Sequence, residues 1–157
     1  MLAIRSAERS DSALIFAFVC KLAEYEKLLH MVVATEADIE RDLFGENPRV
    51  FCHLAFWDGA PVGLALWFHN YSTFHARHGI YLEDLFVEPA YRGRGIGKAL
   101  LRHLAQRCAT EGFSRLEWQV LNWNAPSIDF YKSLGAVPVD DWTVFRLAGD
   151  ALKKLAE

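Results

Sequence analysis

The chain has 157 residues, 52% of them hydrophobic, with 17 basic and 20 acidic side chains and a formal net charge of −3. This length fits one domain with one core, so we expect a single domain over residues 1–157. The apolar content excludes a disordered chain, and the slightly acidic balance argues against a general nucleic-acid binder.

The first third of the chain predicts a strand and two helices. Residues 2–5 read as a short strand, and the apolar residues after it recur at helical spacing up to about Tyr25. Thr35, with an acidic residue three positions later, is a helix N-cap, and Gly45 begins the stretch that ends this second helix.

The rest of the chain predicts a sheet with further helices. Residues 50–57 and 61–68 read as two strands, and the Asp58-Gly59 pair between them is a strong hairpin signal. The elements expected beyond this hairpin are a strand at 80–87, a helix at about 96–110, a strand at 116–121, a helix at about 125–134, strands at 137–139 and 143–147, and a terminal helix at 151–156. This order predicts an α+β fold with a mostly antiparallel sheet and helices on both faces.

A glycine-rich turn separates the central strand from the helix that follows. Pro89 ends the strand, because proline has no N–H for a sheet ladder. Gly93, Gly95 and Gly97 then lead into a helix whose first N–H groups lack intrahelical partners, at the positive end of its dipole. Glycines let a backbone approach a ligand closely, so the turn predicts a phosphate-binding loop. The cations beside it are Arg92, Arg94 and Lys98.

The spacing of these glycines excludes two common phosphate-binding motifs. Lys98 occupies the third glycine position of a dinucleotide fingerprint, and Arg92 and Ala99 occupy required positions of a Walker A loop. The pattern that fits is R-x-x-G-x-G over residues 92–97. It resembles the pyrophosphate-binding motif of the GNAT superfamily of acetyl-CoA-dependent N-acetyltransferases.

Three further blocks resemble the spermidine/spermine N-acetyltransferase branch of that superfamily. They are residues 23–26 (AEYE), 81–84 (YLED) and 123–132 (WNAPSIDFYK), within a similarity that runs from about Ile4 to Leu155. The resemblance implies the GNAT fold, a mixed and mostly antiparallel sheet that splays between its fourth and fifth strands, with helices on both faces. It also implies an acyltransferase that moves an acetyl group directly to a small amine.

The same resemblance implies acetyl-CoA as the co-substrate. Its pantetheine arm is expected to bond to the backbone of the central strand, and its pyrophosphate to lie on the glycine-rich turn. The expected acetyl-CoA-binding residues are Leu85, Phe86, Val87, Arg92, Gly93, Arg94, Gly95, Ile96, Gly97, Lys98, Asn124, Ser127 and Tyr131. The expected acceptor-binding residues are Tyr25, Glu26, Glu83, Asp84 and Trp118.

Acetyl transfer needs a neutral amine, whereas an alkylamine with a pKa near ~10.4 is protonated at neutral pH. Glu83 is the expected base, and Tyr131 is expected to give a proton or a hydrogen bond to the departing thiolate. On a regular strand Glu83 and Asp84 point to opposite faces, so only one of them would face the acceptor. The structural alternatives are a carboxylate in an edge salt bridge and a tyrosine packed in the core.

Acidic residues dominate the expected lid over the acceptor. Between residues 36 and 46 five carboxylates accompany the single cation Arg41, and Glu24 and Glu26 precede them. Such a run is commonly a solvated helix face, but one facing a cleft would concentrate cationic substrates. We therefore rank diamines and polyamines ahead of a lysine-like amino acid, for whose carboxylate only Lys27 is an obvious partner.

Two other functions fit the same motifs. A protein or peptide N-acetyltransferase would need an open acceptor groove, whereas residues 25 and 26 suggest a cleft closed by a helix and a loop. A non-catalytic, acetyl-CoA-binding regulatory domain is the other alternative, and the presence of both Glu83 and Tyr131 argues against it.

The remaining features concern metals and location. The cysteines at positions 20, 52 and 108 show no paired spacing, so we expect reduced thiols in a cytoplasmic protein. The only close histidine pair, at 75 and 78, lacks further ligands, so we expect no metal site. Charges interrupt the N-terminal apolar run and no stretch reaches ~20 apolar residues, so we expect no signal peptide and no membrane span. The resemblance implies a homodimer.

Overall fold

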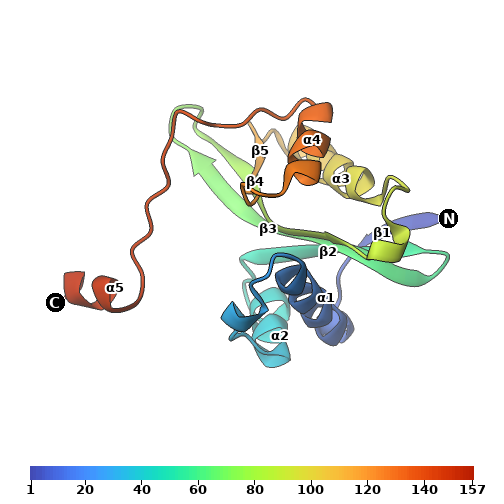
Figure 1. Ribbon diagram of the computed structural model, residues 1–157, viewed down its shortest axis with the longest axis horizontal. Coiled ribbons are helices and arrows are strands. Elements are labelled where there is room, and N and C mark those ends of the chain that lie inside the picture. Colours follow the sequence, from blue (N-terminus) through green and yellow to red (C-terminus); the bar gives the residue numbers. More distant parts are fainter. The chain divides into compact units, whose positions relative to one another are not determined.

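The computed structural model describes all 157 residues and divides them into two compact units, Met1–Gln119 and Val120–Glu157 (Figure 1). The strands are β1 (Leu2–Ser6), β2 (Val50–Trp57), β3 (Ala60–Ser72), β4 (Arg77–Val87) and β5 (Leu116–Trp118). The α-helices are α1 (Ser12–Tyr25), α2 (Glu36–Phe44), α3 (Ile96–Glu111), α4 (Ala125–Ser133) and α5 (Gly149–Leu155). Short 3₁₀ turns lie at Arg9–Asp11, Leu29–Met31 and Pro89–Tyr91. None of the helices combines the length and the apolar character needed to cross a membrane.

The first unit is built on an open five-stranded sheet in the order β1-β2-β3-β4-β5. The first four strands pair antiparallel, while β4 and β5 pair in parallel. This parallel pairing covers only residues 80–82 of β4, although β4 continues to Val87. The sheet therefore opens between its fourth and fifth strands, which confirms the splay that the sequence predicts.

Helices cover both faces of this sheet, with α1 and α2 on one side and α3 on the other (Figure 1). Ile15 and Phe18 of α1 pack against Leu66 and Phe86 of the sheet, and the Phe18 and Phe86 rings lie 5.4 Å apart. The apolar positions of α3 that recur every four residues are buried as well: Ile96, Leu100, Leu104 and Cys108. We call the two sides of the sheet the α1 face and the α3 face.

Local sequence signals set the ends of the helices. The Thr35 hydroxyl accepts a hydrogen bond from the N–H of Asp38, whose carboxylate accepts one from the N–H of Thr35, so the predicted capping box is formed. Gly95 and Gly112 flank α3 with φ angles of 78° and 71°. Glycine suits these left-handed conformations because it has no Cβ.

The second unit lacks the two strands predicted near the end of the chain, so that prediction is wrong. It contains α4 and α5, but residues 137–139 and 143–147 form no strands, and β5 ends at Trp118 rather than at residue 121. A strand exists only when a neighbouring backbone completes its hydrogen bonds, and this segment pairs with no strand of its own chain. Its large apolar side chains are exposed as a result, among them Val137, Trp142, Val144 and Phe145.

Candidate active site

The glycine-rich turn has the geometry of an anion-binding loop. Gly93 and Gly95 both have φ of 78°, and a Cβ placed on either would meet no atom within 4 Å, so the space above the turn is open. Gly95 is the N-cap of α3, so the N–H groups of the first helical turn begin at this opening. These residues fit the pyrophosphate of acetyl-CoA through backbone donors and the helix dipole.

Aromatic rings orient the two arginines of the turn. The guanidinium of Arg92 lies 4.9 Å from the centre of the Tyr25 ring, at the end of α1. That of Arg94 lies 5.4 Å from the Trp57 ring and 5.1 Å from the Tyr91 ring. These cation–π contacts attach the turn to α1 and to β2. The first of these contacts joins Tyr25, which the resemblance assigns to acceptor binding, to Arg92, which it assigns to acetyl-CoA binding.

The free edge of β4 beyond the splay can bind an extended chain. Residues 83–87 lie past the pairing with β5, so this edge offers backbone groups to a ligand. One of these groups is already bonded, because the Val87 oxygen accepts a hydrogen bond from Arg92 Nε at 3.0 Å. The edge includes Leu85, which the resemblance assigns to the pantetheine arm.

A β-bulge interrupts β4 at its two adjacent carboxylates. Leu66 of β3 pairs with Asp84, and the next residue of β3, Trp67, pairs with Leu82. Glu83 is therefore an extra residue with no partner on β3. Two residues of a bulged strand oppose one residue of its neighbour, which shifts the alternation of side chains.

The bulge overturns the expectation that Glu83 and Asp84 point to opposite faces. Leu66 belongs to the core on the α1 face, and Asp84, its partner, shares that face. Phe68, two residues further along β3, pairs with Tyr81, which places Tyr81 there too. Glu83 follows Tyr81 by two residues, so Glu83 and Asp84 lie on the same face. The expectation of opposite faces failed because a bulge depends on the register between two strands, which one sequence segment does not reveal.

Three carboxylates interact on this face. Burial, together with the charges of Glu83 and Glu26, raises the pKa of Asp84 to about 7. Burial, followed by the charge of Glu83, raises the pKa of Glu26, which is the C-cap of α1. Carboxyl groups that repel one another are stabilised by a bound cation. The cluster of Glu26, Glu83 and Asp84 can therefore hold an ammonium group and accept a proton.

A second polar group lies on the same face at β5. Glu117, which pairs with Tyr81, accepts a hydrogen bond from Asn70 Nδ2 at 2.9 Å, and its ion pair with Arg115 Nε has a distance of 2.7 Å. Sequence reasoning missed Arg115 and Asn70. Arg115 could have been found, because it lies two residues before Glu117 and a strand repeats its faces every two residues. Trp118 follows Glu117 as the last residue of β5 and is half-buried.

Ion pairs neutralise much of the acidic run on α2. Arg41 binds both Asp38 and Asp42, and Arg9 binds Glu40. The carboxylates of α2 thus behave largely as a solvated helix face, which is the alternative interpretation of such a run.

The second unit contains the other predicted residues. Asn124 is buried and caps α4, where its Oδ1 accepts a hydrogen bond from the N–H of Ser127 at 3.4 Å. This cap is a structural role for two residues that the resemblance assigns to acetyl-CoA. Tyr131 lies on α4, half-buried, with its ring 5.5 Å from that of Phe130.

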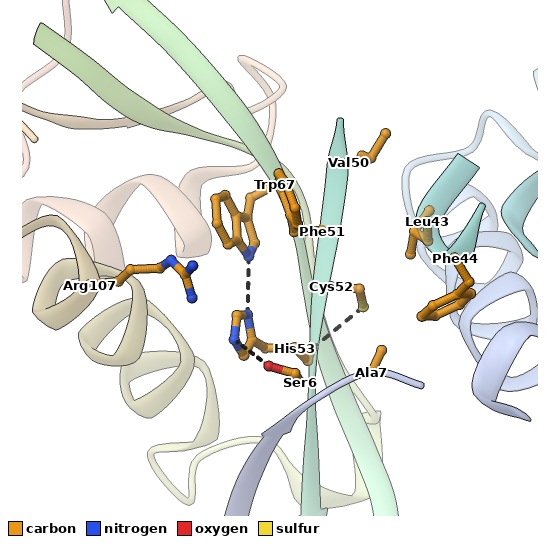
Figure 2. A pocket seen from close by; sticks show the side chains of 10 residues that line it. All are labelled: Ser6, Ala7, Leu43, Phe44, Val50, Phe51, Cys52, His53, Trp67 and Arg107. Carbon is orange, nitrogen blue, oxygen red and sulfur yellow. Dashed lines mark hydrogen bonds between the residues drawn. The ribbon is translucent and has the colours of Figure 1, made fainter. Parts of the chain in front are cut away.

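A small cavity elsewhere in the first unit, of about 190 Å³, holds none of the predicted site residues (Figure 2). At its wall the Trp67 indole N–H donates to His53 Nδ1 at 3.1 Å, and His53 Nε2 lies 3.3 Å from the Ser6 hydroxyl. Burial, then the neighbouring charges of His103 and Arg107, lowers the pKa of His53 to about 4. His53 is therefore a neutral, structural histidine. No group of three or more His, Cys, Asp or Glu side chains is arranged to hold a metal ion.

Comparisons with known proteins identify the family of the chain and its fold. The chain matches the model of the acetyltransferase (GNAT) family over residues 20–136. It is 39% identical to a thialysine N-epsilon-acetyltransferase of Bos taurus, over 98% of this chain and 96% of that protein. It is 33% identical to a spermidine/spermine N(1)-acetyltransferase-like protein of Homo sapiens, over 98% of this chain and 23% of that protein. An integron cassette protein of V. cholerae superimposes with a TM-score of 0.82 at 28% identity, covering 99% of this chain and 98% of that one.

The open sheet, splayed at its fourth strand, and the family match together define an acyltransferase. The chain belongs to the acetyltransferase (GNAT) family. Its fold and its activity as an N-acetyltransferase of small amines are as the sequence predicts.

Proposed function

We propose that the chain transfers the acetyl group of acetyl-CoA to the side-chain amine of a lysine-like amino acid. The observation that carries this proposal is the cluster of Glu26, Glu83 and Asp84 on one face of β4, where the sheet opens. A primary ammonium suits such a cluster because it supplies the positive charge that the three carboxyls lack.

The acceptor proposed here differs from the first choice made from the sequence alone. The relative named for thialysine, a lysine analogue, matches this chain at 39% identity over nearly all of both chains. Arg115, on the same sheet face as Glu83, offers a partner for a carboxylate, which a polyamine does not have. A polyamine remains the second candidate, since a relative named for spermidine and spermine matches at 33% identity.

Glu83 is proposed to take a proton from the bound ammonium, directly or through water, which leaves a neutral amine. Asp84 and Glu26 hold the acceptor while this occurs. Acetyl-CoA supplies an activated acetyl thioester, and the acetyl group passes directly to the amine while both substrates are bound. Tyr131 is proposed to give its phenolic proton, or a hydrogen bond, to the departing thiolate.

Acetyl-CoA is supported as the co-substrate by the turn at Gly93 and Gly95 and by the free edge of β4. The turn offers backbone N–H groups to the pyrophosphate, and Lys98 adds charge in the first turn of α3. The edge at Leu85 and Val87 offers the polar groups that an amide-containing arm pairs with.

We also propose that both units belong to one domain and that the protein is a cytoplasmic homodimer. The family match at residues 20–136 runs across the boundary between the units, which supports a single domain. The three cysteines are all free, as suits a reducing compartment. The exposed apolar side chains of residues 137–147 support burial against a second copy.

The test is to incubate each of a panel of amines with the protein and acetyl-CoA and to measure the reaction by the release of free thiol. Thialysine, lysine, ornithine, spermidine, a short diamine and a neutral arylamine should be compared by kcat/KM. We expect thialysine or another lysine-like amino acid to rank first. A protein that prefers the neutral arylamine, or that releases thiol with none of these amines, contradicts the proposal.

A further inference from the structure

A mixed-charge network crosses three strands on the α1 face of the sheet. Asn70 of β3 reaches over β4 and donates from Nδ2 to Glu117 of β5, with a distance of 2.9 Å. Arg115 precedes β5, and its Nε lies 2.7 Å from the same Glu117 oxygen. The network thus places a cation, an anion and an amide side by side.

Gly79 makes this arrangement possible. A Cβ at position 79 would lie 2.6 Å from Asn70 Oδ1 and 3.2 Å from Arg115 Cγ, so a larger residue there would displace both side chains. These contacts also place both side chains over β4. Gly79 lies two residues before Tyr81, and the two share a face.

The network retains unused hydrogen-bonding capacity. A guanidinium has five N–H donors, and Glu117 is bound through the Nε of Arg115, which leaves the two terminal nitrogens. Both contacts to Glu117 use its Oε1, which leaves Oε2. The Arg115 and Glu117 side chains are 42% and 35% exposed, so a ligand can reach them.

The spacing between this network and the carboxylate cluster suits a lysine-like molecule. Glu117 of β5 pairs with Tyr81, and Glu83 lies two residues further along β4, about 7 Å from Tyr81. With the ~4.8 Å spacing between neighbouring strands, the backbones at Glu117 and Glu83 are about 8 Å apart. The stem of a lysine-like side chain spans five bonds of ~1.5 Å, or roughly 6 Å in extended form. One acceptor can therefore reach both groups.

We propose that Arg115 and Glu117, held in place by Asn70, bind the amino-acid end of the acceptor. Arg115 takes the α-carboxylate and Glu117 the α-ammonium, while the side-chain amine lies at Glu26, Glu83 and Asp84. This inference rests on the proposed function and deepens it. Arg115 offers its contact only to an acceptor that carries a carboxylate, so it favours an amino acid over a diamine.

The experiment compares thialysine with its decarboxylated diamine in native protein and in the Arg115→Gln and Arg115→Lys variants. Loss of one charge-assisted contact should lower kcat/KM for thialysine by about tenfold to a hundredfold in Arg115→Gln, mainly through KM. The diamine should keep its kcat/KM or gain. Arg115→Lys should recover part of the loss, because it keeps the charge but not the fork of donors.

Arg107→Gln is the matched control. Arg107 also forms an ion pair with a glutamate, Glu111, but it lies on α3, and its guanidinium lies over the Trp67 ring on the α3 face. This variant should leave the ratio of the two substrates unchanged. An equal loss for thialysine and the diamine in Arg115→Gln, or no loss for thialysine, overturns the inference.

A binding measurement separates this inference from the proposed function. Calorimetry of thialysine with native protein and Arg115→Gln in the presence of CoA needs no turnover. Tenfold or greater weakening in the variant supports the subsite even if acetyl transfer prefers another amine. Equal affinity in the two proteins overturns the subsite, even if the panel of amines shows active acetylation.

Discussion

The protonation of the Asp84 carboxyl affects the stability of the folded chain. Burial and the charges of Glu83 and Glu26 raise the pKa of Asp84 to about 7. Between its ordinary pKa near 3.8 and this value, the folded chain binds more protons than the unfolded chain, so the free energy of unfolding falls as pH rises through this window. The cluster is therefore stabilised either by a proton or by a cation beside it.

Binding of an amine should release protons near pH 7. A cation beside Asp84 favours its ionised form, lowers its pKa and so expels the proton that the free protein holds. Calorimetry of a lysine-like acceptor with CoA present, in two buffers of different ionisation enthalpy, measures the number released. We expect the native protein to release a measurable fraction of a proton per acceptor bound, and the Asp84→Asn variant to release much less. The same heat in both buffers for native protein would contradict this assignment.

Tyr131 carries the second residue-scale prediction. Tyr131→Phe keeps the ring and removes the phenolic proton, so kcat should fall by roughly 10²–10⁴-fold. Affinity for CoA, measured by calorimetry, should change little because the ring remains. A variant with native kcat would show that Tyr131 does not act on the leaving thiolate.

Secondary-structure elements follow from the sequence where the signal is local. The capping box at Thr35, the Asp58-Gly59 hairpin and the apolar repeat of α3 each depend on neighbouring residues, and each is formed. The bulge at Glu83 depends on the register between β3 and β4, so no single segment predicts it. The residues after α4 have strand-like composition, but no strand of the chain pairs with them.

The same limit applies to the candidate site. Glu26, Glu83 and Asp84 were found through motifs, but their shared face arises from the bulge and from the end of α1. The link between Asn70 and Glu117 spans 47 positions in sequence, and only the sheet order brings these residues together.

The contact between β2 and β3 at His53 predicts acid sensitivity. Trp67 donates its indole proton to His53 Nδ1, so protonation of His53 breaks this bond inside the core. Because the pKa of His53 is lowered to about 4, the unfolded chain binds more protons between pH 6.5 and 4, and stability falls as pH falls through this range.

Urea unfolding at pH 7 and pH 5 measures this effect. The loss of unfolding free energy should be larger for native protein than for His53→Gln by roughly 2 kcal/mol, since the variant cannot titrate. Comparing the two proteins at the same pH values removes the opposite contribution of Asp84. An equal loss in both would show that His53 does not set the acid response.

At the scale of the whole molecule, the segment after α4 leaves the most apolar surface exposed, because it pairs with no strand of its own chain. Val144 and Phe145 are 72% and 93% exposed in the single chain. Light scattering on the eluting protein should give twice the chain mass, and Phe145→Asp should shift the population towards monomer, because burying a charge in an apolar interface is costly. A monomer at micromolar concentration, with no change in the variant, would contradict the homodimer.

In the proposed complex the acceptor lies with its side-chain amine at the carboxylates of the β4 bulge and its amino-acid end at Arg115 and Glu117. The most direct measurement is the position of the acetyl group in the product, determined by NMR after turnover of thialysine and acetyl-CoA. We predict acetylation of the side-chain nitrogen alone, with the α-amine unmodified. Acetylation of the α-amine, or no acetylated thialysine, would contradict this placement of the acceptor.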